Sequence, residues 1–418
     1  MITGEALSPE TELILACART AVDAATAERI DALLRQELDL RHVRWIARRN
    51  AVTALVFRNL WPRLPEAMRQ GQLQQLRQHA QWTAFTNLMR SRTLLELLDL
   101  LQAEGIAAIP YKGPVLGQVA YQDVALRQFG DLDLIVPAEK ALQARDVLLR
   151  HGFIQTWPEA ALTPAQEAQH LQTKYNFTLA RASDNLEVEL HWAVTNRYIN
   201  LPPRAGLLWS YLEPTALGGR MVPSFTPEVL LLILTAHGSN HCWNRLIWVC
   251  DVAETVRTFG ARIDWERLLA LAEAWHGQRM LLIGLHLAQT LLGAPLPAAV
   301  AQTARADKTA VALARQSRAK LLAVQHVPFR PLEEPFYHLR MLDDGRARWR
   351  YGAEVIRPST KDWLYWPLPP RLAWLYYLVR PVRLIHEHGI QLLPWRVEVE
   401  DWSAQPAVEE EGAASGEP

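Results

Sequence analysis

The hydrophobic periodicity of the chain changes at Gly105, and this change limits the folds that the sequence can adopt. Residues 78–104 contain no glycine or proline, and one buried helical face is indicated by Leu94, Leu97, Leu98 and Leu101. Beyond Gly105, apolar residues alternate with polar ones along short segments, which is typical of strands. The chain must therefore combine long helices with a small sheet.

The segment from residue 105 to residue 222 has the pattern of a small α/β unit. We expect strands in GIAAIPY, FGDLDLIV, YNFTLA and LEVELHWAV, with helices beginning near KGPVLG and at Pro137. The sequence thus predicts an α+β fold with a small mixed sheet flanked by large helical segments. Its expected parts are a helical region (1–104), the α/β core (105–222), a second helical region (223–400) and a disordered acidic tail (401–418).

Composition excludes several classes of function. Lys and Arg number 44 and Asp and Glu also number 44, so there is no surplus of cations for general nucleic-acid binding. Three cysteines are too few for a disulfide framework. The richest apolar run, from Val229 to Ala236, is far shorter than the ~20 residues that cross a bilayer. We therefore expect a cytoplasmic protein without membrane insertion.

Acidic residues gather on two of the expected strands. Asp131 and Asp133 are two residues apart, so both side chains leave the same side of their strand, and so do Glu187 and Glu189 on another strand. Neighbouring carboxylates repel each other unless a divalent cation lies between them, and oxygen ligands favour Mg²⁺ or Mn²⁺. Acids at a strand end also serve solubility or prevent edge pairing, so the pattern alone leaves both interpretations open.

Two neighbouring features favour a phosphate ligand beside these acids. Lys112 and Gly113 occupy an expected strand-to-helix turn, where backbone amides commonly receive phosphate. Gly130 precedes Asp131 and permits a ligand to approach the backbone closely. Pro114 removes one backbone donor from the turn, which weakens the case for phosphate more than the case for metal.

These motifs resemble those of bacterial nucleotidyltransferase family proteins in the DNA polymerase β-like superfamily. The matching elements are a Lys-Gly turn, an Arg before a Gly-Asp-x-Asp strand, and an acid followed by Leu-His-Trp. In this chain they are Lys112, Gly113, Arg127, Gly130, Asp131, Asp133, Glu189, Leu190, His191 and Trp192. The similarity extends into the later helical segments, among them HGSNHCWNRLIWVCDVA.

The resemblance implies an enzyme that moves a nucleoside monophosphate from a nucleoside triphosphate such as ATP to an acceptor hydroxyl by a two-metal mechanism. It implies that Asp131, Asp133 and Glu189 are catalytic and hold Mg²⁺ (or Mn²⁺). It also implies that the nucleotide is bound by Lys112, Gly113, Arg127 and Gly130, with His191 and Glu187 beside the metal ligands. The sequence leaves the acceptor open among a small molecule, a glycan, a peptide and a protein. The alternative is a catalytically inactive relative that binds nucleotide or regulates a partner.

Two further groups of residues attract attention. His237 and His241 are four residues apart on an expected helix, but Gly238 stands where a zinc-protease motif has glutamate. We expect these histidines to pack between helices or to contact the catalytic core. We also expect the tryptophans from Trp363 to Trp374 to pack between helices, since the chain carries no cationic surplus to accompany stacking on nucleic acid.

Overall fold

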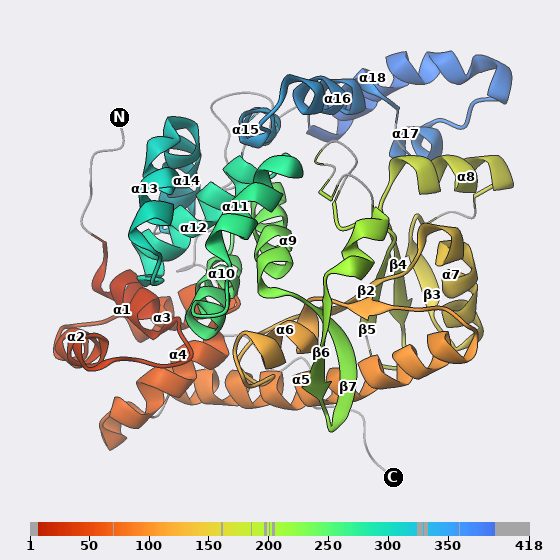
Figure 1. Cartoon of the computed structure of the whole chain (residues 1–418). Helices are drawn as coiled ribbons and strands as arrows, with labels where there is room; N and C mark the ends of the chain where they lie inside the picture. The colour runs from red at the N-terminus through yellow and green to blue at the C-terminus, as the bar shows by residue number, and fades with distance from the viewer. Residues whose placement is uncertain are drawn as a thin grey trace, which may run out of the picture.

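The computed structural model describes residues 7–388 except 70, 160–161, 185, 196–198, 200, 203–204, 324–328, 330–332 and 359. Helices surround a five-stranded mixed sheet and a separate two-stranded sheet, so the predicted α+β fold is confirmed (Figure 1). The expected tail at 401–418 lies outside the described residues. Within the described ranges, no helix is both long and apolar enough to cross a membrane.

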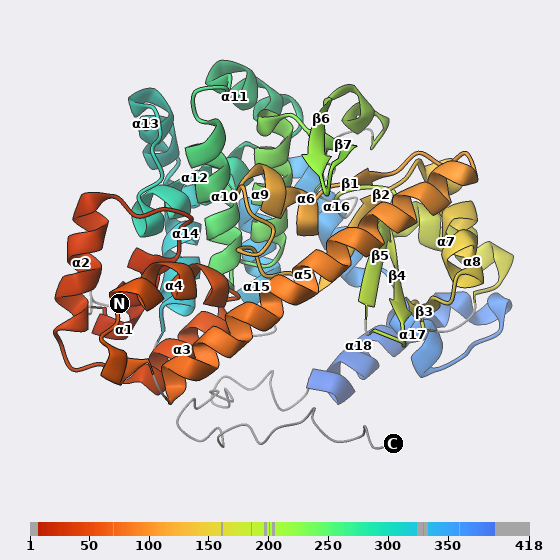
Figure 2. The same cartoon turned by 90° about the horizontal axis from the view of Figure 1, so that it is seen from below.

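Four short helices precede one long helix. They are α1 (Pro9–Cys17), α2 (Ala24–Leu34), α3 (Leu40–Arg49) and α4 (Thr53–Leu60), followed by the 3₁₀ turns η1 (Trp61–Arg63) and η2 (Glu66–Met68). Side chains of Ser8, Asp23 and Asp39 accept backbone amide hydrogens at the starts of α1, α2 and α3, which satisfies donors that a helix start leaves free. The long helix α5 (Gln72–Ala103) then crosses the molecule from the N-terminal helices to α7 (Figure 2).

The main sheet has the strand order β1-β2-β5-β4-β3. Its strands are β1 (Ile109–Pro110), β2 (Asp131–Ile135), β3 (Ile154–Trp157), β4 (Asn176–Arg181) and β5 (Leu186–His191). Strands β2 and β5 are parallel, and the other neighbours are antiparallel. Helices α6 (Gly113–Val119), η3 (Ala138–Lys140), α7 (Ala141–Arg150) and α8 (Pro164–Thr173) connect the strands.

Four elements of the segment 105–225 do not appear among the expected strands and helices. Strand β3 and helix α8 lie between α7 and β4, and a hairpin of β6 (Leu212–Leu217) and β7 (Arg220–Phe225) follows the turn η4 (Ala205–Ser210). Strand β3 has only four residues, and its first residue, Ile154, is 60% exposed. A short edge strand with little buried surface leaves a weak periodic signal.

One face of the main sheet is apolar and the other is polar. Leu132 and Leu134 of β2 and Val188 and Leu190 of β5 are fully buried in a core with α5 and α7. Because side chains alternate along a strand, the acidic residues of β2 and β5 leave the opposite face. The apolar face therefore anchors the two strands, and the carboxylates project away from that core.

Of the remaining helices, the earlier ones lie beside the sheet and the last ones extend across the molecule towards α8 (Figure 1). They are α9 (Pro227–Asn240), α10 (Leu246–Phe259), α11 (Trp265–Ala274), α12 (Gln278–Leu292), α13 (Ala298–Ala306), α14 (Lys308–Leu321), α15 (Glu333–Met341), α16 (Gly345–Ile356), α17 (Thr360–Tyr365), η5 (Pro370–Leu375) and α18 (Tyr376–His388). A single hydrophobic core joins several of them to α1, α3 and α4. The two helical regions of the sequence thus share one interior, while their exact division from the α/β core stays a prediction.

Two tryptophans near the end of the described chain are more exposed than the sequence analysis expects. Trp366 and Trp374 are 59% and 63% exposed, so the expectation that they pack between helices is wrong for both. The sequence pattern gave no way to tell which side of these short helices faces solvent.

Candidate active site

The parallel pairing of β2 and β5 brings the acidic residues together. Asp131 lies opposite Glu187 and Asp133 lies opposite Glu189 in the strand register. Paired residues on neighbouring parallel strands project to the same face, so all four carboxylates share the polar face of the sheet. His191, two residues after Glu189, joins them on this face.

Three side chains converge most closely. Asp133, Glu189 and His191 each offer one ligand atom, and these atoms lie within 4.8 Å of one another. His191 Nε2 is 3.0 Å from Glu189 Oε2 and 3.2 Å from Asp133 Oδ1. The site therefore contains an imidazole nitrogen among its potential metal ligands, in addition to the carboxylate oxygens that the sequence analysis emphasised.

Lys112 supplies the nearest positive charge. Its Nζ donates to Asp133 Oδ1 at 2.7 Å, and both side chains are buried. Burial alone would raise the pKa of Asp133, but the Lys112 ammonium and the bond from His191 hold that pKa well below its usual range. Burial disfavours the charged form of Lys112 and so acts to lower its pKa. The negative charges of the nearby carboxylates outweigh this effect, and the Lys112 pKa is raised. This ion pair is therefore charged on both sides at neutral pH.

Asp131 has a different environment. Burial and then the charge of Asp133 raise the pKa of Asp131 to about 6. For Glu189, burial raises the pKa, but the hydrogen bond and charge of His191 lower it below its ordinary value. The negative charge of Asp131 is thus destabilised by its neighbours, whereas that of Glu189 is stabilised by His191. A divalent cation near Asp131 would reduce the repulsion there.

The donor set fits a divalent metal ion. Asp133 is 3% exposed, and its Oδ2 is buried without a hydrogen-bond partner among the described residues. A buried carboxylate oxygen without a partner is costly, which favours an additional ligand at this atom. Oxygen donors with one imidazole suit Mg²⁺ and, better, Mn²⁺. Asp131, Asp133, Glu189 and His191 are therefore the residues that could hold such an ion.

The turn before α6 explains the Lys-Gly pair. Gly113 has a φ of 48°, and a Cβ there would lie 3.4 Å from the Asp131 carbonyl oxygen, so glycine suits both the backbone conformation and the close approach. Pro114 falls in the first turn of α6, where its missing amide hydrogen would have had no helical acceptor. The turn thereby brings Lys112 against β2.

Arg127 forms its hydrogen bonds with Asp251, although its charge also acts on Asp131 of the cluster. Its Nε and Nη2 donate to Asp251 Oδ1 and Oδ2 of α10 at 2.8 and 2.9 Å, and Tyr121 donates to the same carboxylate at 2.7 Å. Asn87 of α5 donates to the Arg127 carbonyl oxygen. This buried pair joins the segment before β2 to α10, and the expected contact of Arg127 with nucleotide stays a prediction. Gly130, in contrast, is exposed, and a Cβ there would meet no atom within 4 Å.

A comparison with family models identifies the domain that contains these residues. Residues 36–293 match the family described as uncharacterised nucleotidyltransferase. The match covers more than half of the chain and includes β2, β5 and α10. The chain belongs to this nucleotidyltransferase family. No curated protein and no solved structure matches the chain.

The nucleotidyltransferase domain also contains two tyrosines that sequence reasoning missed. The Tyr111 hydroxyl lies 3.2 Å from His191 Nε2, and the Tyr175 ring stacks on the His191 ring at a centroid distance of 5.7 Å. Tyr111 directly precedes Lys112, which was the one available signal in the sequence. The signal for Tyr175 is absent, because this residue comes near His191 only through the pairing of β4 with β5.

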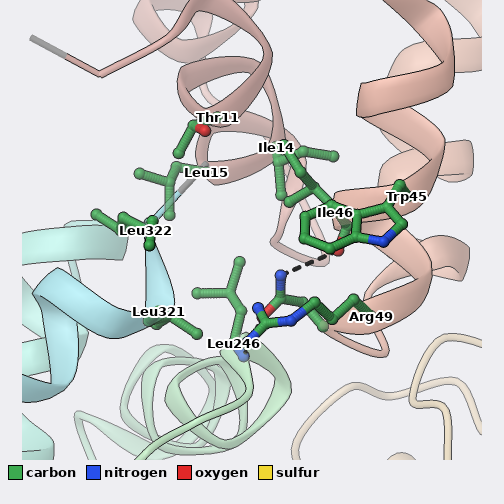
Figure 3. A pocket seen from close by; sticks show the side chains of 11 residues that line it. Thr11, Ile14, Leu15, Trp45, Ile46, Arg49, Leu246, Leu321 and Leu322 are labelled. Atoms are coloured by element: carbon green, nitrogen blue, oxygen red, sulfur yellow. Dashed lines mark hydrogen bonds between the residues drawn. The ribbon is translucent and has the colours of Figure 1, made fainter. Parts of the chain in front are cut away.

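A second site, a pocket away from the carboxylates, has a mainly apolar lining (Figure 3). It measures about 320 Å³ including its open mouth and lies where α1, α3 and the start of α10 meet the end of α14. Its lining is mainly apolar, with Arg49 over the Trp45 ring at 5.6 Å. The residues that line it are Thr11, Ile14, Leu15, Trp45, Ile46, Arg49, Asn50, Leu246, Leu321, Leu322 and Ala323. Since none of these is a carboxylate, this pocket does not resemble the site on β2 and β5.

Proposed function

We propose that the protein transfers a nucleoside monophosphate from a nucleoside triphosphate to an acceptor hydroxyl with the help of Mg²⁺ or Mn²⁺. The convergence of Asp133, Glu189 and His191 in a chain of the nucleotidyltransferase family is the observation that carries this proposal. Asp131 lies on the same face and completes the proposed ligand set. Nucleoside triphosphates are cytoplasmic metabolites, so the proposed place of action is the cytoplasm.

The metal, when bound, would neutralise the carboxylates, polarise the α-phosphate and make the acceptor hydroxyl more acidic. In the proposed reaction the acceptor oxygen bonds to the α-phosphorus. The bond from that phosphorus to the β-phosphate oxygen breaks, and pyrophosphate leaves with the electron pair.

Glu189 is the residue best suited to accept the hydroxyl proton. Its side chain is 26% exposed, whereas that of Asp133 is 1% exposed, so Glu189 is more accessible to an acceptor. While His191 Nε2 carries a proton and is not a metal ligand, its hydrogen bond lowers the Glu189 pKa despite burial, so this carboxylate is ionised and able to take a proton. The proton then passes to solvent.

Lys112 and Gly113 are the proposed contacts for the triphosphate. The Lys112 ammonium is charged and lies against the carboxylates, where it can balance the charge of the departing pyrophosphate. The exposed Gly130 leaves room beside Asp131. We do not include Arg127, because both of its paired nitrogens bond to Asp251.

The test uses each of the four triphosphates labelled at the α-phosphate, with Mg²⁺ and separate fractions of small molecules, glycans, peptides and proteins as acceptors. We expect one triphosphate to label one fraction and to release pyrophosphate. Asp131→Asn and Asp133→Asn should each abolish the transfer. Asp184→Asn is the matched control, because Asp184 lies in the β4–β5 turn and bonds to Arg181. Equal transfer by the wild type and the Asp133→Asn variant would refute the catalytic proposal.

One observation favours a second candidate function, that of a nucleotide-binding protein without catalysis. The Lys112 ammonium already neutralises Asp133, the most buried carboxylate of the cluster. A fixed ammonium can substitute for part of the charge of a metal without supplying its reactivity. Calorimetric binding of a triphosphate with no pyrophosphate release in any acceptor fraction would support this second function, and the absence of binding would refute both.

A further inference from the structure

An aromatic surface lies where α9 ends and α10 begins. The His237 and His241 ring centroids are 4.7 Å apart, and the His241 ring stacks on the Trp248 ring at 5.0 Å with an interplanar angle of 29°. His241 is exposed, while His237 and Trp248 are half-buried. The two helices lie side by side in both views (Figures 1 and 2). The exposed His241 residue, with its ring stacked on Trp248, thus lies at the surface of this junction.

The turn between the helices has an unusual backbone conformation that a buried side chain stabilises. Cys242 and Trp243 both have positive φ values, 52° and 56°, which non-glycine residues rarely adopt. The Trp243 indole is fully buried, and a Cβ on either Gly238 or Gly284 would lie within 3 Å of it. Its Nε1 donates to Ser239 Oγ at 3.2 Å. The buried indole therefore fixes a turn that the backbone alone would not choose, and His241 stays at the surface.

The two histidines lie within electrostatic reach of the carboxylate site. The charges of Lys112 and Asp133 act on His237, and those of Lys112 and Glu189 act on His241. Although solvent reaches His241, the protein around it desolvates the imidazole, and this effect, followed by the charge of Lys112, lowers the pKa of His241 to about 4. The same two causes place the pKa of His237 well below its usual range. Both imidazoles are consequently neutral at neutral pH. They offer flat rings and single hydrogen-bonding atoms rather than the positive charge that attracts phosphate.

We infer that His241 and Trp248 form the platform on which the base of the nucleoside triphosphate stacks, while its phosphates lie at Lys112 and the carboxylates. This inference rests on the proposed function and adds the part of the site that recognises the base. Stacking of a base on an aromatic ring tolerates every base, because each has a flat π-face. The platform therefore contributes affinity for any nucleoside triphosphate and little selectivity among bases.

The test compares two probes by calorimetry in the presence of Mg²⁺: ATP, which has a base, and inorganic tripolyphosphate, which has none. The wild type should bind ATP more tightly. Trp248→Leu removes the flat ring and should weaken ATP binding about tenfold, with tripolyphosphate binding unchanged. Trp248→Phe retains a ring and should retain most of the ATP affinity. Trp265→Leu, at the half-buried first residue of α11, is the matched control and should bind both probes as the wild type does.

His241→Ala provides a second variant in case Trp248→Leu does not fold. Because its side chain is exposed, this change should preserve the fold while weakening ATP binding in the same selective way. Equal affinities of the wild type for the two probes, or equal weakening of both probes in the variants, would overturn the platform and leave the proposed function intact. A wild type that binds neither probe would overturn the proposed function as well.

Discussion

Replacing Asp251 by leucine should destabilise the protein strongly, because the change would strand a buried charge. Arg127 and Asp251 are 5% and 1% exposed, and two hydrogen bonds of 2.8 and 2.9 Å join them. Although burial opposes it, the charge of Asp251 raises the pKa of Arg127 further above its already high value. Without its partner the guanidinium would remain charged in the protein interior.

The magnitude follows from the burial of the pair. Removing one partner of a buried ion pair costs about 3–5 kcal/mol, whereas apolar replacement of both partners is often close to neutral. Tyr121 also donates to Asp251, and the loss of that acceptor adds about 1 kcal/mol. We therefore expect Asp251→Leu to lose about 4–6 kcal/mol of unfolding free energy. The variant that combines Asp251→Leu, Arg127→Met and Tyr121→Phe should recover most of this loss.

Urea unfolding followed by tryptophan fluorescence measures these differences. The control is Asp184→Leu, which breaks the more exposed pair with Arg181 and should cost less than about 1 kcal/mol. A loss of less than about 1 kcal/mol for Asp251→Leu, or a triple variant as unstable as the single one, would refute the reasoning. The triple variant should also bind Mg·ATP as the wild type does. A stable triple variant that fails to bind ATP would indicate that Arg127 contacts the phosphates after all.

Three further changes test other parts of the structure. Lys112→Met leaves the Asp133 carboxylate buried without the ammonium that pairs with it, so its unfolding free energy in EDTA should fall by about 3 kcal/mol. Added Mn²⁺ should raise the melting temperature of this variant more than that of the wild type. Equal shifts in melting temperature would contradict the argument. Because the His241 pKa is lower in the folded protein, the unfolded chain binds a proton at a higher pH than the folded protein does. The stability of the wild type should therefore fall as the pH drops from about 6.5 towards 4. An equally steep fall in the urea midpoint of a His241→Gln variant would contradict this. Gly284→Ala places a Cβ 2.5 Å from Thr235 Cγ2 and should cost about 1–3 kcal/mol in thermal unfolding. Its control, Gly352→Ala in α16, meets no atom within 4 Å and should stabilise by up to about 1 kcal/mol, so the opposite order of the two variants would contradict the packing argument.

Much of the fold could be predicted because its elements carry strong local signals. The helix that ends near Gly105 and the strands around Asp131 and Glu189 have clear periodicity, and all three are present in the structure. The short strand β3 and the exposed faces of the last helices were not predicted. Their residues contribute little to a buried core, so their sequence patterns contain little information about which face is covered.

The amino-acid sequence established which chemistry was available, because the spacing of Asp131 and Asp133 on a strand requires both carboxylates to share a face. Which groups meet these carboxylates depended on how the chain folds. The parallel register of β2 and β5 placed Glu189 and His191 beside Asp133, and the packing of α10 gave Arg127 a partner 124 residues away. Local periodicity describes residues a few positions apart, whereas such contacts depend on how distant elements pack. The same limit applies to His241 and Trp248, whose rings stack because α9 and α10 pack together.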